Sequence, residues 1–305
     1  MSSPLSTANQ ASNQPYVGRF APSPSGALHF GSLVTALASY IHARQHQGKW
    51  LVRIEDIDPP REQAGAADDI LRTLDAYGLH WDSEVFYQSQ QSERYRAILQ
   101  TLLKCKQAYY CTCTRAQIKA HGGIYQGHCK TLARTPENAA IRVINNVGHY
   151  RFNDIFQGTV SCQQALAAED FTVLRKDGLF AYQLAVVADD IEQNISHIIR
   201  GADLLEPTAR QLSFYQILAQ PAPLFGHVPL VVTEQGYKLS KQNKAPAIDQ
   251  KRPQPSIIAA LKFLGQTPPS DLVEQDVDTI IDWAVSQVNF TKMPKQPEIV
   301  LSVFE

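Results

Sequence analysis

The first third of the chain alternates between short apolar runs and one longer run with helical spacing. Residues 16–21 form an apolar run of strand length, and residues 31–46 place apolar side chains at i, i+4 positions along one helix face. Gly48 ends that helix, and residues 50–54 predict a second strand. A strand–helix–strand unit of this length predicts a parallel pair of strands. The apolar stripe of the helix consists of Leu33, Leu37 and Ile41.

Further helices and strands are predicted on both sides of a region with a different character. Between residues 109 and 170, cysteines, glycines and short strand-like runs replace the earlier pattern. The chain therefore indicates an α/β fold with an inserted subdomain. We predict helices over residues 62–78, 92–106 and 201–218, strands over 180–187, 195–200 and 227–232, and helices from residue 256 onward.

The composition is that of a globular protein. The 305 residues are 44% hydrophobic and 19% charged, and no apolar run approaches the length of a membrane span. Residues 1–15 lack the basic start and apolar run of a secretory signal, and their Ser, Asn, Gln and Pro content predicts a flexible segment. We therefore expect a cytoplasmic protein.

The net charge of −1 conceals two basic segments. Residues 115–134 contain four basic side chains and no acidic one, and residues 238–252 contain five against the single Asp249. Such segments suit contact with RNA over part of the surface, although taken alone they are more often solvated faces. The basic side chains are Arg115, Lys119, Lys130, Arg134, Lys238, Lys241, Lys244, Lys251 and Arg252.

The loop between the first strand and the first helix carries groups that suit anions. Arg19 and Ser23 can hold a carboxylate. His29, Gly31 and Ser32 offer an imidazole, a bare backbone and a helix N-terminus to a phosphate. The loop therefore predicts a site that brings an anionic small molecule against a nucleotide.

Three cysteines cluster in the inserted segment. Cys111 and Cys113 are followed by Cys129 within a glycine-rich stretch, and three thiols this close in a reducing compartment favour a metal over a disulfide. Zinc needs a fourth ligand, and by chemistry alone His128 or His121 is the first choice. The remaining cysteines, expected to be buried thiols, are Cys105 and Cys162.

Five ordered motifs resemble those of the class I aminoacyl-tRNA synthetases that act on glutamate and glutamine. Residues 19–32 resemble their HIGH signature in the form RFAPSPxGxLHxG, and residues 238–242, KLSKQ, resemble their KMSKS loop. The other three motifs are RIEDID at 53–58, AYQ at 181–183 and IRGAD at 199–203. The resemblance, which covers roughly residues 16–245, implies a Rossmann-like catalytic domain with a parallel sheet.

Two positions depart from these signatures. Gln242 stands where the fuller loop signature has Lys or Ser, so loop closure is expected to differ, while Lys241 is retained. Ser32 replaces the last His of the first signature, a change that the similar glutamyl-Q tRNA(Asp) synthetases share.

The resemblance implies a role in adenylate formation for the residues of each motif. Arg19 and Arg200 are expected to clamp the carboxylates of glutamate, and Glu55, at the carboxyl end of a parallel strand, to hold its ammonium group. His29 and Lys241 are the expected catalytic residues, because they can stabilise charge as pyrophosphate leaves. The expected glutamate-binding residues are Arg19, Phe20, Ala21, Pro22, Ser23, Glu55, Tyr182 and Arg200. The expected ATP-binding residues are His29, Gly31, Ser32, Lys238, Ser240 and Lys241, with Mg²⁺ accompanying the ATP.

Taken without the resemblance, two of these residues have plainer interpretations. Glu55 is then a strand-end ion-pair partner of Arg53 or Arg61, and Tyr182 is a core aromatic side chain.

The cysteine segment also takes part in the resemblance. Its spacing, CxC followed by YxGxC, is similar to the zinc site of glutamyl-Q tRNA(Asp) synthetases and of some glutamyl-tRNA synthetases. This likeness implies one structural Zn²⁺ with a tyrosine oxygen as the fourth ligand. The implied ligands are Cys111, Cys113, Tyr125 and Cys129.

The activity implied by the resemblance is ATP-dependent activation of L-glutamate and its transfer to the cyclopentenediol of queuosine at the wobble position of tRNA(Asp). About sixty residues follow Lys244, which we expect to form a short helical region without an anticodon-binding domain. The alternatives are a truncated glutamyl-tRNA synthetase that charges a tRNA 3′ end and a non-catalytic, zinc-bearing RNA-binding paralogue. The expected divisions are a flexible segment (1–15), the first catalytic half (16–108), the inserted zinc-bearing subdomain (109–170), the second catalytic half (171–245) and the C-terminal region (246–305).

Overall fold

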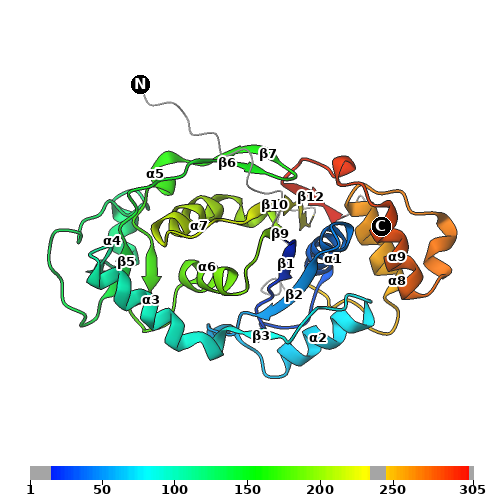
Figure 1. Ribbon diagram of the computed structural model, residues 1–305, viewed down its shortest axis with the longest axis horizontal. Coiled ribbons are helices and arrows are strands. Elements are labelled where there is room, and N and C mark those ends of the chain that lie inside the picture. The colour runs from blue at the N-terminus through cyan, green and yellow to red at the C-terminus, as the bar shows by residue number, and fades with distance from the viewer. Residues whose placement is uncertain (1–14, 234–244, 302–305) are drawn as a thin grey trace.

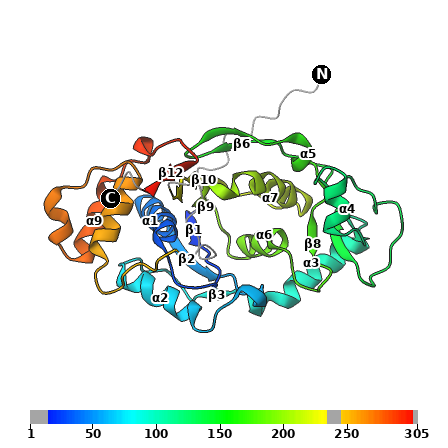
Figure 2. The same cartoon turned by 180° about the vertical axis from the view of Figure 1, so that it is seen from behind.

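The computed structural model describes residues 15–233 and 245–301. The molecule is elongated, with the helices α8 (Gln254–Phe263) and α9 (Val277–Gln287) at one end (Figure 1). The helix α4 (Arg115–Ala120) lies at the opposite end, and the reverse view shows the same arrangement (Figure 2). Within the described residues, no helix combines the length and apolar content that crossing a bilayer requires.

The predicted strand–helix–strand unit is confirmed. Strand β1 (Val17–Phe20) leads through a loop to helix α1 (Phe30–Gln45), and strand β2 (Lys49–Ile54) returns parallel to β1, with Phe20 opposite Val52. A short strand β3 (Phe86–Tyr87) extends the pair in the same direction. The carboxyl ends of these parallel strands lie at one edge, where such sheets bind ligands.

A second parallel arrangement adjoins the first. Strand β9 (His197–Gly201) pairs with β10 (Leu224–Val228), and β10 pairs with β6 (Arg151–Asp154), which forms a hairpin with β7 (Gly158–Ser161). The order is β7-β6-β10-β9. Strand β1 lies beside β9, and Ser196 donates its backbone N–H to the carbonyl of Val17 at 2.9 Å. Residues from the segment 109–170 thus extend a sheet whose other strands come from residues 197–228.

Two predictions of secondary structure were wrong. The apolar run 180–187, predicted as a strand, belongs to helix α6 (Tyr182–Glu192). Its residues 184–190 are all buried, so the helix shows no amphipathic period that would distinguish it from a buried strand. The run 227–232 is two strands, β10 and β11 (Leu230–Val232), because Pro229 lies between them and has no N–H to continue a ladder.

The C-terminal region is largely helical, as predicted, with one addition. Helices α8 and α9 pack against α1, and the ring of Phe30 meets that of Phe263 edge-on at 6.1 Å between centroids. The region also contributes a strand, β12 (Glu298–Val300), which pairs in parallel with β11. The other long helices are α2 (Ala66–Ala76), α3 (Ser92–Lys104) and α7 (Leu205–Ile217).

The cysteine-bearing lobe is built on a three-stranded antiparallel sheet. Strand β5 (Ala140–Val143) lies between β4 (Ala108–Cys111) and β8 (Thr172–Leu174). Helix α4 follows β4 directly and begins with a reciprocal capping box between Thr114 and Gln117. A single turn of helix, α5 (Gln164–Ala167), precedes β8.

Candidate functional site

The β1–α1 loop is tied to its surroundings through its backbone. The carbonyl of Pro22 accepts the N–H of Glu55 at 3.0 Å, and the carbonyl of Leu28 accepts the N–H of Ile248 at 3.0 Å. His29 caps α1, because its Nδ1 accepts the N–H of Ser32 at 3.3 Å. The imidazole is thereby fixed at the positive end of a sixteen-residue helix.

A cavity of about 230 Å³ opens beside this helix N-terminus. His29, Gly31 and Ser32 line it together, and a Cβ at Gly31 would lie only 3.2 Å from the His29 ring. A side chain at this position would therefore press on the imidazole unless the ring shifted by a few tenths of an ångström. Other lining residues, which the motif analysis did not assign to a nucleotide site, are Thr35, Gly201, Asp203, Pro229, Leu230 and Val231.

A second cavity of about 220 Å³ is lined by residues of the same loop. Ser23 lines both cavities, and Glu55 lines this second one. Its rim carries an ion pair between Arg61 and Asp58, and Arg175 approaches the same carboxylate at 3.4 Å. The two cavities thus share the loop that was predicted to bring two ligands together.

Arg19 is buried beside Asp190 and Arg53, and the motifs did not predict that these three side chains would meet. Its Nε lies 3.2 Å from Asp190 Oδ1, and Arg53 Nη1 lies 2.8 Å from the same oxygen. Arg53 Nη2 also approaches Glu55 Oε1 at 3.5 Å, so Glu55 does form the strand-end ion pair with Arg53. Although burial alone raises the pKa of Asp190, Arg53 and Arg19 outweigh it and hold that pKa below its usual value.

Glu55 remains available for a cationic group despite this ion pair. Its side chain is 11% exposed, and its contact with Arg53 is longer than a hydrogen bond. Burial raises the pKa of Glu55, and the charges of Arg53 and Arg19 only partly oppose that rise. A cation placed in the adjoining cavity would oppose that rise and favour the ionised form.

Arg200 projects from β9 into the protein and is 3% exposed. Its Nε faces His227 at 3.0 Å, and its Nη2 donates to Thr208 and Gln211, at 2.7 Å each. Its Nη1 has no hydrogen-bond partner among the described residues. A buried guanidinium nitrogen without a partner is costly, so this atom marks a place for an anionic ligand group.

Tyr182 is not a core aromatic. It begins α6 and is 38% exposed. The charges of Arg200, Glu55 and Arg19 all act on its phenol group. Four side chains predicted from four separate motifs therefore lie in one region of the structure.

The other predicted site residues differ in how far their side chains are exposed to a ligand. The side chain of Phe20 is buried and stacks over Trp50, so its backbone is the part that can face a ligand. Ala21 is half-buried and Pro22 is buried. The predicted residues Lys238, Ser240 and Lys241, together with Gln242, lie outside the described residues.

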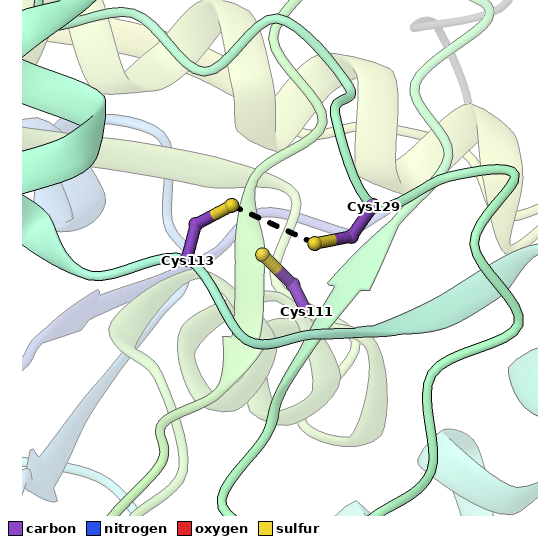
Figure 3. A group of neighbouring side chains, drawn as sticks. All are labelled: Cys111, Cys113 and Cys129. Carbon is purple, nitrogen blue, oxygen red and sulfur yellow. Dashed lines mark hydrogen bonds between the residues drawn. The ribbon is translucent and has the colours of Figure 1, made fainter.

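The three cysteines of the distal lobe point toward one another (Figure 3). The sulfurs of Cys111, Cys113 and Cys129 all lie within 4.8 Å of each other, and those of Cys113 and Cys129 are 3.5 Å apart. Burial opposes ionisation of Cys129, but hydrogen bonds from the Thr112 backbone and the neighbouring thiols outweigh it and lower its pKa to about 6. The cluster therefore holds a thiolate ready for a metal ion.

Tyr125 is buried beside these thiols. Its phenol oxygen accepts the N–H of Cys129 at 2.7 Å, and the guanidinium of Arg142 lies 3.9 Å from the centre of its ring. Burial and a hydrogen bond with Cys111 raise the pKa of the phenol. A nearby cation is what would be needed to ionise it.

The histidine alternatives for a fourth metal ligand do not join this group. His121 and His128 are both exposed. In the described part of the chain, the group of His, Cys, Asp and Glu side chains close enough to share an ion contains the three cysteines alone. The donor set of three sulfurs and one phenol oxygen fits a tetrahedral zinc site.

Two predictions about the other cysteines were wrong. Cys105 is exposed at the end of α3, and Cys162 is half-buried. Their positions just outside regular elements leave them partly in solvent, which residue type alone does not reveal.

Comparisons with known proteins agree with this geometry. The family model of class I tRNA synthetases (E and Q), catalytic domain, matches residues 16–271. The glutamyl-Q tRNA(Asp) synthetase of Colwellia psychrerythraea is 58% identical over 93% of this chain and 94% of its own length. That of Escherichia coli K12 is 52% identical, with coverage of 95% and 94%.

Solved structures show the same relationship at greater distance. A glutamate tRNA ligase from Elizabethkingia meningosepticum, in complex with its amino acid, superimposes with a TM-score of 0.76 at 25% identity. The match covers 93% of this chain and 66% of that ligase. The chain therefore belongs to the class I tRNA synthetases of the E and Q group and, within that group, to the glutamyl-Q tRNA(Asp) synthetases.

Proposed function

We propose that this protein activates L-glutamate with ATP and transfers the glutamyl group to the cyclopentenediol of queuosine in tRNA(Asp). The observation that carries the proposal is a set of three charged side chains that all act on the phenol of Tyr182. Two buried guanidinium groups, those of Arg19 and Arg200, and one carboxylate, that of Glu55, match the two carboxylates and one ammonium group of glutamate. The acceptor is suggested by the relatives, which carry that name and match nearly the whole chain.

The first step needs positioning and charge stabilisation, with no covalent enzyme intermediate. A carboxylate oxygen of glutamate attacks the α-phosphorus of ATP, and pyrophosphate leaves with the electron pair of the broken bond. Arg200 Nη1, which has no hydrogen-bond partner among the described residues, has free capacity to hold a carboxylate. The N-terminus of α1, with His29 and Gly31 at the 230 Å³ cavity, suits the phosphates. Mg²⁺ accompanies the ATP as part of that substrate.

Lys241 is assigned by its motif. The described residues on either side of 234–244 lie at the first loop, because Val231 lines the cavity with His29 and Ala247 forms a bridge with His29. A lysine there would supply a mobile ammonium for the charge that develops on pyrophosphate.

In the second step a hydroxyl of the cyclopentenediol attacks the carbonyl carbon of glutamyl-adenylate. An ester forms, AMP leaves, and the hydroxyl proton passes to a phosphate oxygen or to solvent. The exposed basic side chains Arg115, Lys119 and Arg134, on the distal lobe, are our candidates for contacts to RNA phosphates.

We also propose one structural Zn²⁺ on Cys111, Cys113, Tyr125 and Cys129. Tetrahedral zinc with Zn–S bonds of about 2.3 Å places its sulfurs about 3.8 Å apart. The 3.5 Å separation of Cys113 and Cys129 is close to that geometry. The ion would cross-link β4 to the loop that precedes β5, and it has no place in the chemistry of glutamate.

The test has two stages. Glutamate-dependent exchange of labelled pyrophosphate into ATP, without tRNA, tests activation. Labelled glutamate is then offered to tRNA(Asp) with and without queuosine, and nuclease digestion locates the label. Label on queuosine supports the proposal. Label on a 3′-terminal adenosine would instead show a glutamyl-tRNA synthetase, and absence of exchange would favour a non-catalytic RNA-binding protein.

A further inference from the structure

Arg200 is held along one edge of its guanidinium and open on the other. Its Nε and Nη2 face His227, Thr208 and Gln211, whereas its Nη1 has no partner among the described residues. An arginine of about 3% exposure can keep one nitrogen unsatisfied only if its other contacts hold the group in place. Whether Arg200 Nε can donate to His227 depends on which nitrogen of the imidazole carries the hydrogen.

His227 has its ring hydrogen on Nδ1, as its two contacts show. Nε of arginine always carries a hydrogen, so the His227 Nε2 that faces it at 3.0 Å must be the unprotonated, accepting nitrogen. The ring hydrogen is then on Nδ1, which donates to Asp154 Oδ2 at 2.6 Å. All three side chains are buried. Asp154, His227 and Arg200 therefore form a directional chain of hydrogen bonds.

Asp154 is itself fixed from three sides. Its Oδ1 accepts the backbone N–H groups of Phe156, Gln157 and His227 at 3.0, 2.9 and 3.1 Å. Burial alone raises the pKa of Asp154, but the bonds from His227 and the backbone outweigh it and lower that pKa. Burial lowers the pKa of His227 to about 4, with the Arg200 charge acting in the same direction. At neutral pH the chain thus consists of a carboxylate, a neutral imidazole and a guanidinium.

We propose that Asp154 and His227 are positioning residues for the glutamate site, because they select the tautomer that holds Arg200 with Nη1 free for a substrate carboxylate. This inference rests on the proposed function and deepens it. It also gives the β6 strand, which comes from the segment 109–170, a part in glutamate recognition. Asp154 is opposite Phe225 in the β6–β10 pair, so the strand register places its carboxylate beside His227.

The proposal makes Asp154→Asn a tautomer switch. An amide N–H₂ facing His227 Nδ1 would favour the Nε2–H tautomer, which then points a donor at the Arg200 donor. We expect KM for glutamate in pyrophosphate exchange to rise about tenfold or more, the scale of one lost charge-assisted hydrogen bond. KM for ATP should stay within about twofold of its original value, since these residues do not line the ATP cavity.

A pair of variants at His227 gives an independent measurement. His227→Gln keeps an oxygen that can accept from Arg200 Nε, whereas His227→Leu has none. The proposal predicts a smaller rise in glutamate KM for the glutamine variant than for the leucine variant at matched thermal stability. If Asp154→Asn does not fold, this pair decides the question. His197→Gln, at a half-buried histidine on the neighbouring strand β9, is the matched control and should leave both KM values unchanged.

The outcomes separate this inference from the function on which it rests. If the unsubstituted protein shows no glutamate-dependent exchange, the proposed function fails and the inference with it. If exchange is normal but folded Asp154→Asn and His227→Leu proteins keep the original glutamate KM, the positioning role alone is wrong. A parallel rise of both KM values, or a loss of kcat alone, would also contradict it, because that would indicate a general structural effect.

Discussion

Arg19 and Arg53, on the paired strands β1 and β2, share one acceptor: both donate to Oδ1 of Asp190, at 3.2 and 2.8 Å. Two guanidinium groups in the interior repel each other unless a carboxylate lies between them. Asp190, on α6, supplies that charge. The position of Arg19, a proposed glutamate-binding residue, therefore depends on a residue that belongs to none of the recognisable motifs.

Replacing Asp190 by Asn should destabilise the protein strongly. The substitution removes the carboxylate that the two buried guanidinium groups share and leaves Arg53 its longer contact with Glu55. Breaking a buried pair in this way costs about 3–5 kcal/mol. Urea denaturation measures the free energy of unfolding. The matched control is Asp82→Asn, which removes the more exposed pair with Arg44 and should cost no more than about 1 kcal/mol. Equal effects of the two substitutions would show that the Asp190 network contributes no more than a surface ion pair.

Glu55→Gln should weaken glutamate binding and remove a pH dependence. The neutral amide cannot pair with the substrate ammonium, so KM for glutamate should rise by about 10- to 100-fold. Because burial raises the pKa of Glu55, the unsubstituted enzyme should lose affinity for glutamate as the pH falls through that raised value. Pyrophosphate exchange measured from pH 5 to pH 8 tests both points. A pH profile of glutamate KM that is the same for Glu55→Gln and the unsubstituted protein would exclude the proposed role.

Metal content should follow the four predicted ligands. Elemental analysis of the purified protein is expected to find one zinc per chain. Cys111→Ser should lose it, and Tyr125→Phe should weaken binding by about 10- to 100-fold, measured by competition with a chelator. Cys105→Ser alters an exposed cysteine outside the cluster, His128→Ala alters the exposed histidine alternative, and both variants should retain full zinc.

Removal of zinc should loosen the distal lobe and leave glutamate activation nearly intact. The lobe that carries the cysteines contains α4 and β5, which lie at the end of the molecule opposite α8 and α9 (Figure 1). No cysteine lines either cavity of the catalytic loop. Hydrogen exchange should increase around β4 and α4 after chelation. A complete loss of pyrophosphate exchange in the chelated protein would show that the ion supports the active site directly.

Stability should fall as the pH falls from about 6.5 toward 4. Burial lowers the pKa of His42 to about 3 and those of His197 and His227 to about 4 each, so in this range the unfolded chain binds more protons than the folded one. At about 1.4 kcal/mol per pKa unit, each of these groups contributes up to about 3 kcal/mol to the loss. Asp189, whose pKa burial raises to about 6, opposes the trend, and so does Glu55, whose pKa burial also raises.

Urea denaturation at several pH values measures this slope. His42→Phe should flatten it by one group's share, whereas His80→Gln, at an exposed histidine, should leave it unchanged. A free energy of unfolding that stays constant between pH 6.5 and pH 4.5 would mean that these imidazoles are not buried in the neutral form.

Gly265→Ala should destabilise the junction after α8. Gly265 has φ of +77°, and a Cβ there would lie 2.3 Å from the carbonyl oxygen of Lys292. The combined strain and clash should cost about 2 kcal/mol or more. Gly122→Ala is the control, because Gly122 has φ of +92° with open space around it. Thermal unfolding should therefore show the larger decrease in Tm for Gly265→Ala.

Local patterns predicted much of the fold because they report on neighbours in the sequence. The β1–α1–β2 unit, the helices α2, α3 and α7 and strand β9 all lie close to their predicted bounds. The run at 180–187 was misjudged since a helix buried on every side has no polar face to reveal its period. The strand β12 was missed because a three-residue strand is defined by its partner, β11, and not by its own residues.

The candidate site likewise contains residues that the sequence predicted and partners that only the structure revealed. The amino-acid sequence by itself determined the family and nominated Arg19, Glu55 and Arg200, because motif residues are recognisable by type and spacing. Only the tertiary structure brought Asp190 to Arg19 and Asp154 to His227, across separations of 171 and 73 residues. The physical reason is that a buried charge is tolerated only next to its partner, and which partner reaches it depends on strand register and helix packing rather than on distance along the chain.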